Sequence, residues 1–182
     1  VFSSGIVVIY VVVPQSRDLL SKVSESDVSG EAIPFATAKE TIIGAAPVLA
    51  SRIGYVGELG FELHIPSEFA IHVYKELWQS GQEMDIANVG YRAIESLRME
   101  KGYLYWSGDI SPDYSPLEAG LGFRVHFDLK DDFLGRQALE SQMKNGLDRK
   151  LFTFVSEQFL PVTGGETILE SDRVVSLATS VA

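Results

Sequence analysis

Glu62 is the residue whose type and position point most directly to binding chemistry. It lies in a segment, Phe61–Ile65, in which apolar and polar residues alternate, and such alternation is typical of a half-buried strand. Gly57 and Gly60, just before it, would let a ligand approach the backbone closely. Spacing alone leaves two interpretations open: a solvated surface glutamate, or a carboxylate that accepts hydrogen bonds from a ligand.

Other common reactive centres are not indicated by the sequence. The three histidines, His64, His72 and His126, are not at metal-ligand spacing, so we expect no metal site. The absence of cysteine excludes thiolate nucleophiles, cysteine-ligated zinc, iron–sulfur clusters and disulfides. No nucleophile elbow, phosphate-binding Walker loop or dinucleotide-binding glycine motif is present. The sequence therefore offers no candidate catalytic residue.

Composition narrows the class of partner. Of 182 residues 46% are hydrophobic and 22% charged, which is enough apolar material for a core, and the net charge is −10. An acidic chain without a basic patch is a poor nucleic-acid binder. The apolar run 5–14 is too short to cross a membrane and lacks the flanks of a signal peptide. We therefore expect no nucleic-acid or membrane partner.

Strands and helices are expected to alternate along the chain. The patterns predict strands at 5–13, 41–43, 47–55, 61–65, 123–127 and 150–155, helices at 14–24, 67–81, 88–101 and 135–144, and a β segment punctuated by 164–165 and 172–173. Ser67 is expected to cap its helix. In the helix 88–101, Val89 is expected to face inward and Arg98 outward.

Four segments in order carry a resemblance to a known family. They are Tyr55-Val-Gly-Glu-Leu-Gly-Phe-Glu62, Tyr91-Arg-Ala-Ile-Glu-Ser-Leu-Arg-Met-Glu-Lys-Gly-Tyr103, Ser115-Pro-Leu-Glu-Ala-Gly-Leu-Gly122 and Asp132-Phe-Leu-Gly-Arg-Gln-Ala-Leu139. Together they resemble the glycine-cleavage T-protein superfamily. The similarity is greatest to the folate-binding C-terminal half of sarcosine and dimethylglycine dehydrogenases.

The resemblance implies one-carbon chemistry with tetrahydrofolate. In such enzymes an FAD domain oxidises a methylated glycine, and the folate domain captures the carbon as 5,10-methylenetetrahydrofolate. The family's contacts, carried over, would make Glu62 the residue that holds the pterin ring. The rest of the implied folate site is Tyr55, Leu63, His64, Tyr103 and Phe123.

Departures from the family pattern keep alternatives open. Ile94 stands where glycine-cleavage aminomethyltransferases have an arginine, which favours the dehydrogenase branch. Val13 replaces a usual glycine, Gly54 a common Thr or Ser, and Phe123 a tyrosine. The resemblance also places the FAD domain and the family's catalytic aspartate before Val1, so a fragment is expected. A non-catalytic relative, such as the regulatory subunit of pyruvate dehydrogenase phosphatase, and an aminomethyltransferase therefore remain alternatives.

The expected architecture is α+β. A partial folate-binding domain with mixed sheets and packed helices should span 1–130, followed by a truncated C-terminal β-barrel over 131–182. By resemblance, the location is the mitochondrial matrix if the source is eukaryotic, or the cytoplasm if it is bacterial.

Overall fold

The computed structural model describes residues 5–12, 14–129, 131–158 and 161–181, so the departure noted at Val13 lies outside the described residues. The chain divides into two compact units, Val1–Tyr103 and Leu104–Ala182. The elements are β1 (Ile6–Val12), α1 (Ser16–Val23), β2 (Ala38–Ile43), β3 (Ala46–Ser51), β4 (Gly60–Pro66), α2 (Ala70–Ser80), α3 (Tyr91–Glu100), α4 (Arg136–Asn145), β5 (Thr167–Glu170) and β6 (Arg173–Leu177), with short 3-10 turns at Ser67–Phe69, Gln82–Met84 and Gly122–Arg124.

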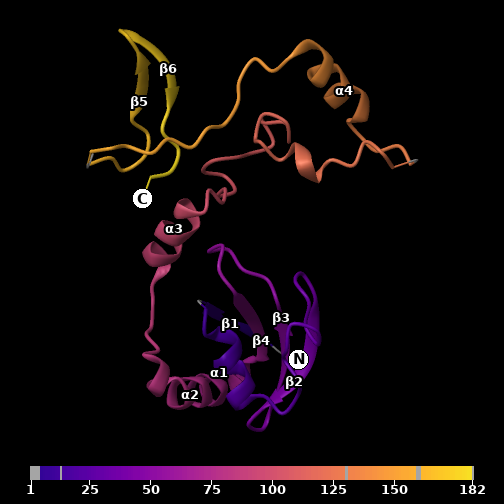
Figure 1. The fold of residues 1–182 in the computed structure, drawn as a ribbon, viewed down its shortest axis with the longest axis vertical. Coiled ribbons are helices and arrows are strands. Elements are labelled where there is room, and N and C mark those ends of the chain that lie inside the picture. Colours follow the sequence, from indigo (N-terminus) through magenta and orange to yellow (C-terminus); the bar gives the residue numbers. More distant parts are fainter. Residues whose placement is uncertain (1–4, 13, 130, 159–160, 182) are drawn as a thin grey trace. The chain divides into compact units, whose positions relative to one another are not determined.

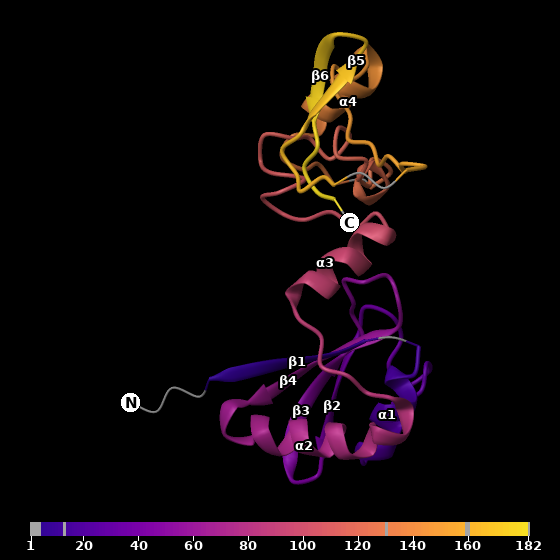
Figure 2. The same ribbon diagram turned by 90° about the vertical axis from the view of Figure 1, so that its left-hand side faces the viewer.

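A four-stranded sheet organises the first unit. The strand order is β1-β4-β3-β2 (Figure 1), with β4 between β1 and β3. The sheets were expected to be mixed, and each pair of neighbouring strands in the described residues is antiparallel. Helices α1 and α2 pack against each other and contact β4 on one side of the sheet (Figure 2). The expected α+β architecture is confirmed.

Strand β4 supplies the centre of the core. Phe61, Leu63 and Ile65 are fully buried and pack with residues of α1, α2, β2 and β3. Successive side chains of a strand point to opposite faces, so Glu62 and His64 lie on the other face. Burying a leucine-sized side chain is worth about 1.5–3 kcal/mol, which fixes the register of this strand.

The sheet face opposite the core is apolar and exposed. Ile6 and Val8 of β1 are 68% and 48% exposed, and Leu49 of β3 is 40% exposed. Glu62 and His64 therefore project from a surface that is otherwise largely hydrocarbon. This surface is here called the outer face.

The end of α3 is organised by a buried arginine. The sequence predicted that Arg98 faces outward, and this is wrong, because its side chain is fully buried. Its Nη1 donates to the Tyr103 carbonyl at 2.8 Å, and its Nη2 pairs with Glu95. A buried guanidinium needs such partners. The expectation that Val89 faces inward is also wrong, since it is 56% exposed and precedes the helix, which begins at Tyr91.

Local hydrogen bonds and turns also explain two differences between the sequence prediction and the structure. The segment 123–127 was expected to be a strand, but Arg124 and Val125 donate their N–H groups to carbonyls three residues earlier, at 2.9 and 3.0 Å. The chain therefore makes a 3-10 turn. Ser67 makes no side-chain cap, because α2 begins only after a 3-10 turn.

The second unit contains α4 and one two-stranded sheet. Strands β5 and β6 form an antiparallel hairpin in the segment for which the sequence predicted β structure. The expected strand at 150–155 is wrong, because the described backbone there has no ladder. Its Leu151 N–H instead donates to the Glu118 carbonyl at 2.9 Å. A C-terminal barrel therefore stays a prediction.

The compact units divide between Tyr103 and Leu104, earlier than the domain boundary expected near residue 130. That expected boundary stays a prediction, because a compact unit and a family domain need not end at the same residue. Within the described residues, no helix has both the length and the apolar character needed to cross a membrane.

A pair of leucines on opposite faces of the sheet tests this arrangement. Leu63→Ala should lower the free energy of unfolding of the first unit by about 2–5 kcal/mol, because it leaves a cavity in a close-packed core. Leu49→Ala, on the neighbouring strand but on the outer face, should cost under about 1 kcal/mol. Urea denaturation followed by circular dichroism measures both. Equal losses would contradict the assignment of the two faces.

Candidate functional site

Glu62 lies in the middle of the outer face. In the strand register it is opposite Tyr10 of β1 on one side and Ser51 of β3 on the other. Its Oε2 lies 3.5 Å from Nε2 of His64, and the two side chains are 38% and 32% exposed. The carboxylate is therefore held at the surface of the sheet, beside solvent, rather than buried in the core.

Tyr10 connects this carboxylate to the following loop. Its phenol oxygen accepts a hydrogen bond from the Tyr55 backbone N–H, in the loop between β3 and β4. Burial raises the pKa of the Tyr10 hydroxyl, and the negative charge of Glu62 acts in the same direction, although the Tyr55 amide opposes it. The hydroxyl therefore keeps its proton through the physiological range of pH.

Tyr55 and Tyr103 come together beside this loop. Their ring centroids lie 6.3 Å apart with planes inclined by 38°, a favourable aromatic geometry. Tyr103 follows α3, and its carbonyl is the group that accepts from the buried Arg98. The arginine of the second motif thus positions an aromatic ring of the candidate site.

The loop before Glu62 is fixed by a close approach and an ion pair. Gly57 has φ +72°, and a Cβ there would collide with the side chain of Lys101. The Nζ of Lys101 lies 2.7 Å from Oε1 of Glu58. Only glycine combines this backbone conformation with this contact at low cost, which explains the glycine-rich spacing in the sequence.

Two hollows flank the carboxylate in the first unit. The smaller, about 230 Å³, is lined by residues of the 52–60 loop with Phe35 and Tyr103. The larger, about 450 Å³, lies on the outer face and is lined mainly by apolar residues, with His64 at its edge. Glu62 is not among the residues that line either hollow. It lies on β4 between Gly60, which lines the smaller hollow, and His64, which lines the larger, and it is opposite Tyr10.

Two of the predicted folate contacts, Leu63 and Phe123, do not have their side chains on the outer face of the first unit. The Leu63 side chain is fully buried in the core, on the face opposite Glu62 and His64, so only its main chain could reach a ligand bound at the outer face. Phe123 belongs to the second unit, where it is 70% exposed and carries the Arg124 guanidinium 5.1 Å from its ring centroid. Tyr55, Glu62, His64 and Tyr103 all lie in the first unit.

Two further residues of the first unit were missed by sequence reasoning. Tyr10 lies in an otherwise aliphatic strand, and the alternation of that strand places its hydroxyl on the same face as Glu62. This position is the signal that could have identified it. Arg52 lines the smaller hollow and brings a positive charge there. Within the described residues no three side chains of the ligating types gather to hold a metal ion.

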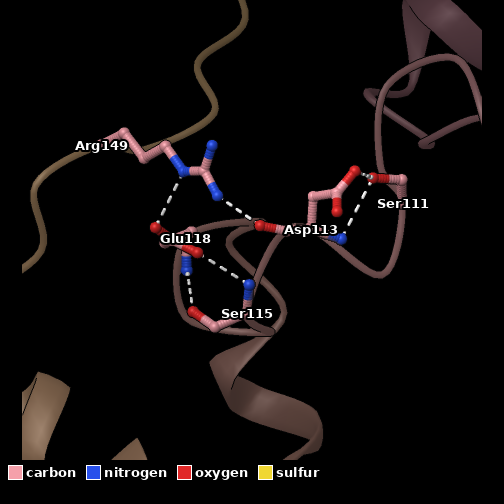
Figure 3. A network of polar contacts seen from close by, with 5 residues as sticks. All are labelled: Ser111, Asp113, Ser115, Glu118 and Arg149. Atoms are coloured by element: carbon pink, nitrogen blue, oxygen red, sulfur yellow. Dashed lines mark hydrogen bonds and ion pairs between the residues drawn. The ribbon is translucent and has the colours of Figure 1, made fainter.

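The carboxylate of the third motif has a structural role (Figure 3). Oε2 of Glu118 accepts from the Ser115 backbone N–H at 2.7 Å, while the Glu118 N–H donates to Oγ of Ser115 at 3.2 Å. Nε of Arg149 donates to Oε1 of Glu118 at 3.0 Å, and its Cζ lies 4.4 Å from the Tyr114 ring centroid. This network joins the segments around residues 115 and 149 of the second unit.

Comparison with known proteins assigns the chain to a class. Residues 2–129 match the family model described as "GCVT N-terminal domain". The chain belongs to this family, and the resemblance to the T-protein superfamily is confirmed.

Individual relatives agree with this assignment. The chain is 45% identical over 162 residues to sarcosine dehydrogenase, mitochondrial, of Homo sapiens, with 89% of this chain and 18% of the relative covered. It is 37% identical over 169 residues to human dimethylglycine dehydrogenase, mitochondrial, covering 92% and 19%. The glycine cleavage system aminomethyltransferase T from Bartonella henselae has a similar structure, with a TM-score of 0.76, 25% identity and coverage of 92% and 45%. The chain thus spans about a fifth of the length of the two human dehydrogenases.

The Glu118 network makes the stability of the second unit depend on pH. The Ser115 amide and then Arg149 hold the pKa of Glu118 below its ordinary value of 4.5. Because the folded pKa is lowered, the stabilisation is present above that value and is lost as the pH falls through the folded pKa. Glu118→Gln should therefore be less stable than wild type at pH 7, and the difference should shrink below about pH 4.5.

Denaturation of both proteins between pH 7 and pH 3 measures this effect. Glu157→Gln, an exposed carboxylate of the same unit, is the control. A difference between Glu118→Gln and wild type that stays constant over the whole range would contradict the role of the ionised carboxylate.

Proposed function

We propose that this chain is the tetrahydrofolate-binding domain of a sarcosine- or dimethylglycine-type dehydrogenase. The observation that carries the proposal is Glu62, which projects from an apolar sheet face with Tyr10 opposite it. The pair of rings Tyr55 and Tyr103 stands beside the same loop. Membership of the GCVT family, whose aminomethyltransferases depend on folate, supports the same assignment.

The chemistry of Glu62 suits a pterin. The reduced pterin ring presents a 2-amino group and the neighbouring ring N–H on one edge, and a carboxylate offers two acceptors side by side to receive them. The apolar outer face would contact the plane of the ring, and Tyr55 and Tyr103 would bound it. His64 would line the same pocket, and Leu63 would contribute through its backbone.

The carbon source follows from the relatives. The two human relatives are named for sarcosine and dimethylglycine, which both carry N-methyl groups. In the proposed enzyme an FAD domain would oxidise the methylated glycine, and this domain would hold the folate that accepts the carbon, giving 5,10-methylenetetrahydrofolate. FAD supplies the oxidation, while Glu62 and the tyrosines bind and orient the acceptor.

Two finer features belong to the same proposal. The residues after 131 would form part of a C-terminal barrel. The human relatives carry mitochondrial names, so a mitochondrial matrix location is proposed for a eukaryotic source, with the cytoplasm as the alternative for a bacterial one.

Calorimetric titration with tetrahydrofolate tests the proposal. Glu62→Ala should weaken binding by about 1.5–3 kcal/mol, roughly ten- to a hundredfold, because it removes a charge-assisted pair of hydrogen bonds. Glu83→Ala is the matched control, since Glu83 is an exposed glutamate of the turn Gln82–Met84 and lines neither hollow. It should leave the affinity unchanged.

Two outcomes would refute the proposal. One is a folded wild-type protein that gives no heat with tetrahydrofolate. The other is an equal loss of affinity in Glu62→Ala and Glu83→Ala, which would point to a diffuse effect of charge rather than to a contact.

A further inference from the structure

The position of Tyr10 relative to Glu62 carries a further inference. The two residues are directly opposed in the antiparallel register of β1 and β4, where opposed side chains share a face with Cβ atoms about 4.5–5.5 Å apart. Ile9 and Val11 pack against the core, so Tyr10 projects on the outer face together with Glu62.

The phenol oxygen of Tyr10 is oriented by the backbone. It accepts from the Tyr55 N–H, and the Val56 amide acts on it in the same sense. A phenol oxygen has two acceptor sites and one proton to donate. With main-chain amides directed at its acceptor side, its remaining function is to donate that proton.

The smaller hollow adjoins this hydroxyl. A Cβ at Gly54 would lie 3.0 Å from the Tyr10 oxygen, and one at Gly60 would lie 3.7 Å from its ring. Both glycines line the hollow. Tyr10 is not itself among the lining residues, but no side chain at these two positions separates its phenol from the hollow. The phenol also lies next to a carboxylate, which can only accept hydrogen bonds.

We propose that Tyr10 is a specificity-determining contact whose hydroxyl donates a hydrogen bond to a ring carbonyl of the ligand. The ring N–H beside that carbonyl would donate a hydrogen bond to Glu62. The pair would then recognise a cyclic amide, in which an N–H donor and a C=O acceptor are neighbours. This inference rests on the proposed function, since the 2-amino-4-oxo edge of a tetrahydropterin has this order of groups.

A ligand with sulfur in place of the 4-oxygen distinguishes this role from a structural one. Replacing the 4-oxo group of tetrahydrofolate by a thioxo group keeps the neighbouring ring N–H for Glu62 but leaves a much weaker hydrogen-bond acceptor for Tyr10. A hydroxyl that only anchored the Tyr55 loop would matter equally for both ligands. A hydroxyl that contacts the 4-oxygen would matter for only one of them.

The experiment measures the affinity of wild type and Tyr10→Phe for tetrahydrofolate and for its 4-thioxo analogue. Tyr10→Phe should weaken tetrahydrofolate about three- to tenfold, as expected for one neutral hydrogen bond. It should change the affinity for the analogue by less than twofold. Tyr74→Phe, which removes a hydroxyl from the exposed side of α2, is the control and should change neither affinity.

Each outcome of this experiment is decisive. Equal weakening of both ligands by Tyr10→Phe would overturn the inference and assign Tyr10 to loop anchoring. Unchanged tetrahydrofolate binding would also overturn it, while a loss in Glu62→Ala would leave the proposed function standing. A folded wild type that binds neither ligand would remove the proposed function and the inference together.

Gly54→Ala gives a second route that leaves the hydroxyl in place. Its Cβ would crowd the Tyr10 oxygen and should shift the proton away from the ligand. It should weaken tetrahydrofolate more than the analogue in the wild-type background. Equal weakening of both ligands by Gly54→Ala would contradict the contact, and this comparison does not need Tyr10→Phe to fold.

Discussion

The two-residue alternation of β4 is the constraint on which the rest of the structure depends. Phe61, Leu63 and Ile65 enter the core between the sheet and its two helices, and this burial determines which face receives Glu62 and His64. A shift by one residue would place two ionisable side chains in hydrocarbon, at a cost of several kcal/mol. The direction of the candidate binding carboxylate is therefore a consequence of core packing.

Strand β1, which pairs with β4, contributes the next residue of the candidate site. Because β1 is held to β4 in one register, Tyr10 is brought opposite Glu62 and reaches the loop that carries Tyr55. The buried Arg98 acts from the other side, since its bond to the Tyr103 carbonyl brings that residue to the Tyr55 ring. Three separate parts of the chain thus meet at one loop, each held by a contact of its own.

Local patterns predicted what local forces decide. The alternation around Glu62 and the apolar spacing of α2 required no knowledge of distant residues, and both elements form close to where the patterns indicated. Arg98 was assigned to solvent because its partner, the Tyr103 carbonyl, exists only once the chain has turned beyond α3. Tyr10 was missed for the same reason, since its role depends on strand pairing across more than fifty residues.

The resemblance singled out Glu62 among the carboxylates of the motifs, and the structure gives a physical reason to prefer it to Glu118. Glu118 already takes the Ser115 amide and the Arg149 guanidinium, and a carboxylate engaged in this way has little capacity left for a ligand. Glu62 meets His64 at 3.5 Å and keeps 38% of its side chain exposed. Of the two, Glu62 can accept new donors without first losing a structural bond. It is therefore the better suited to the binding role that we propose, while Glu118 joins two segments of the second unit.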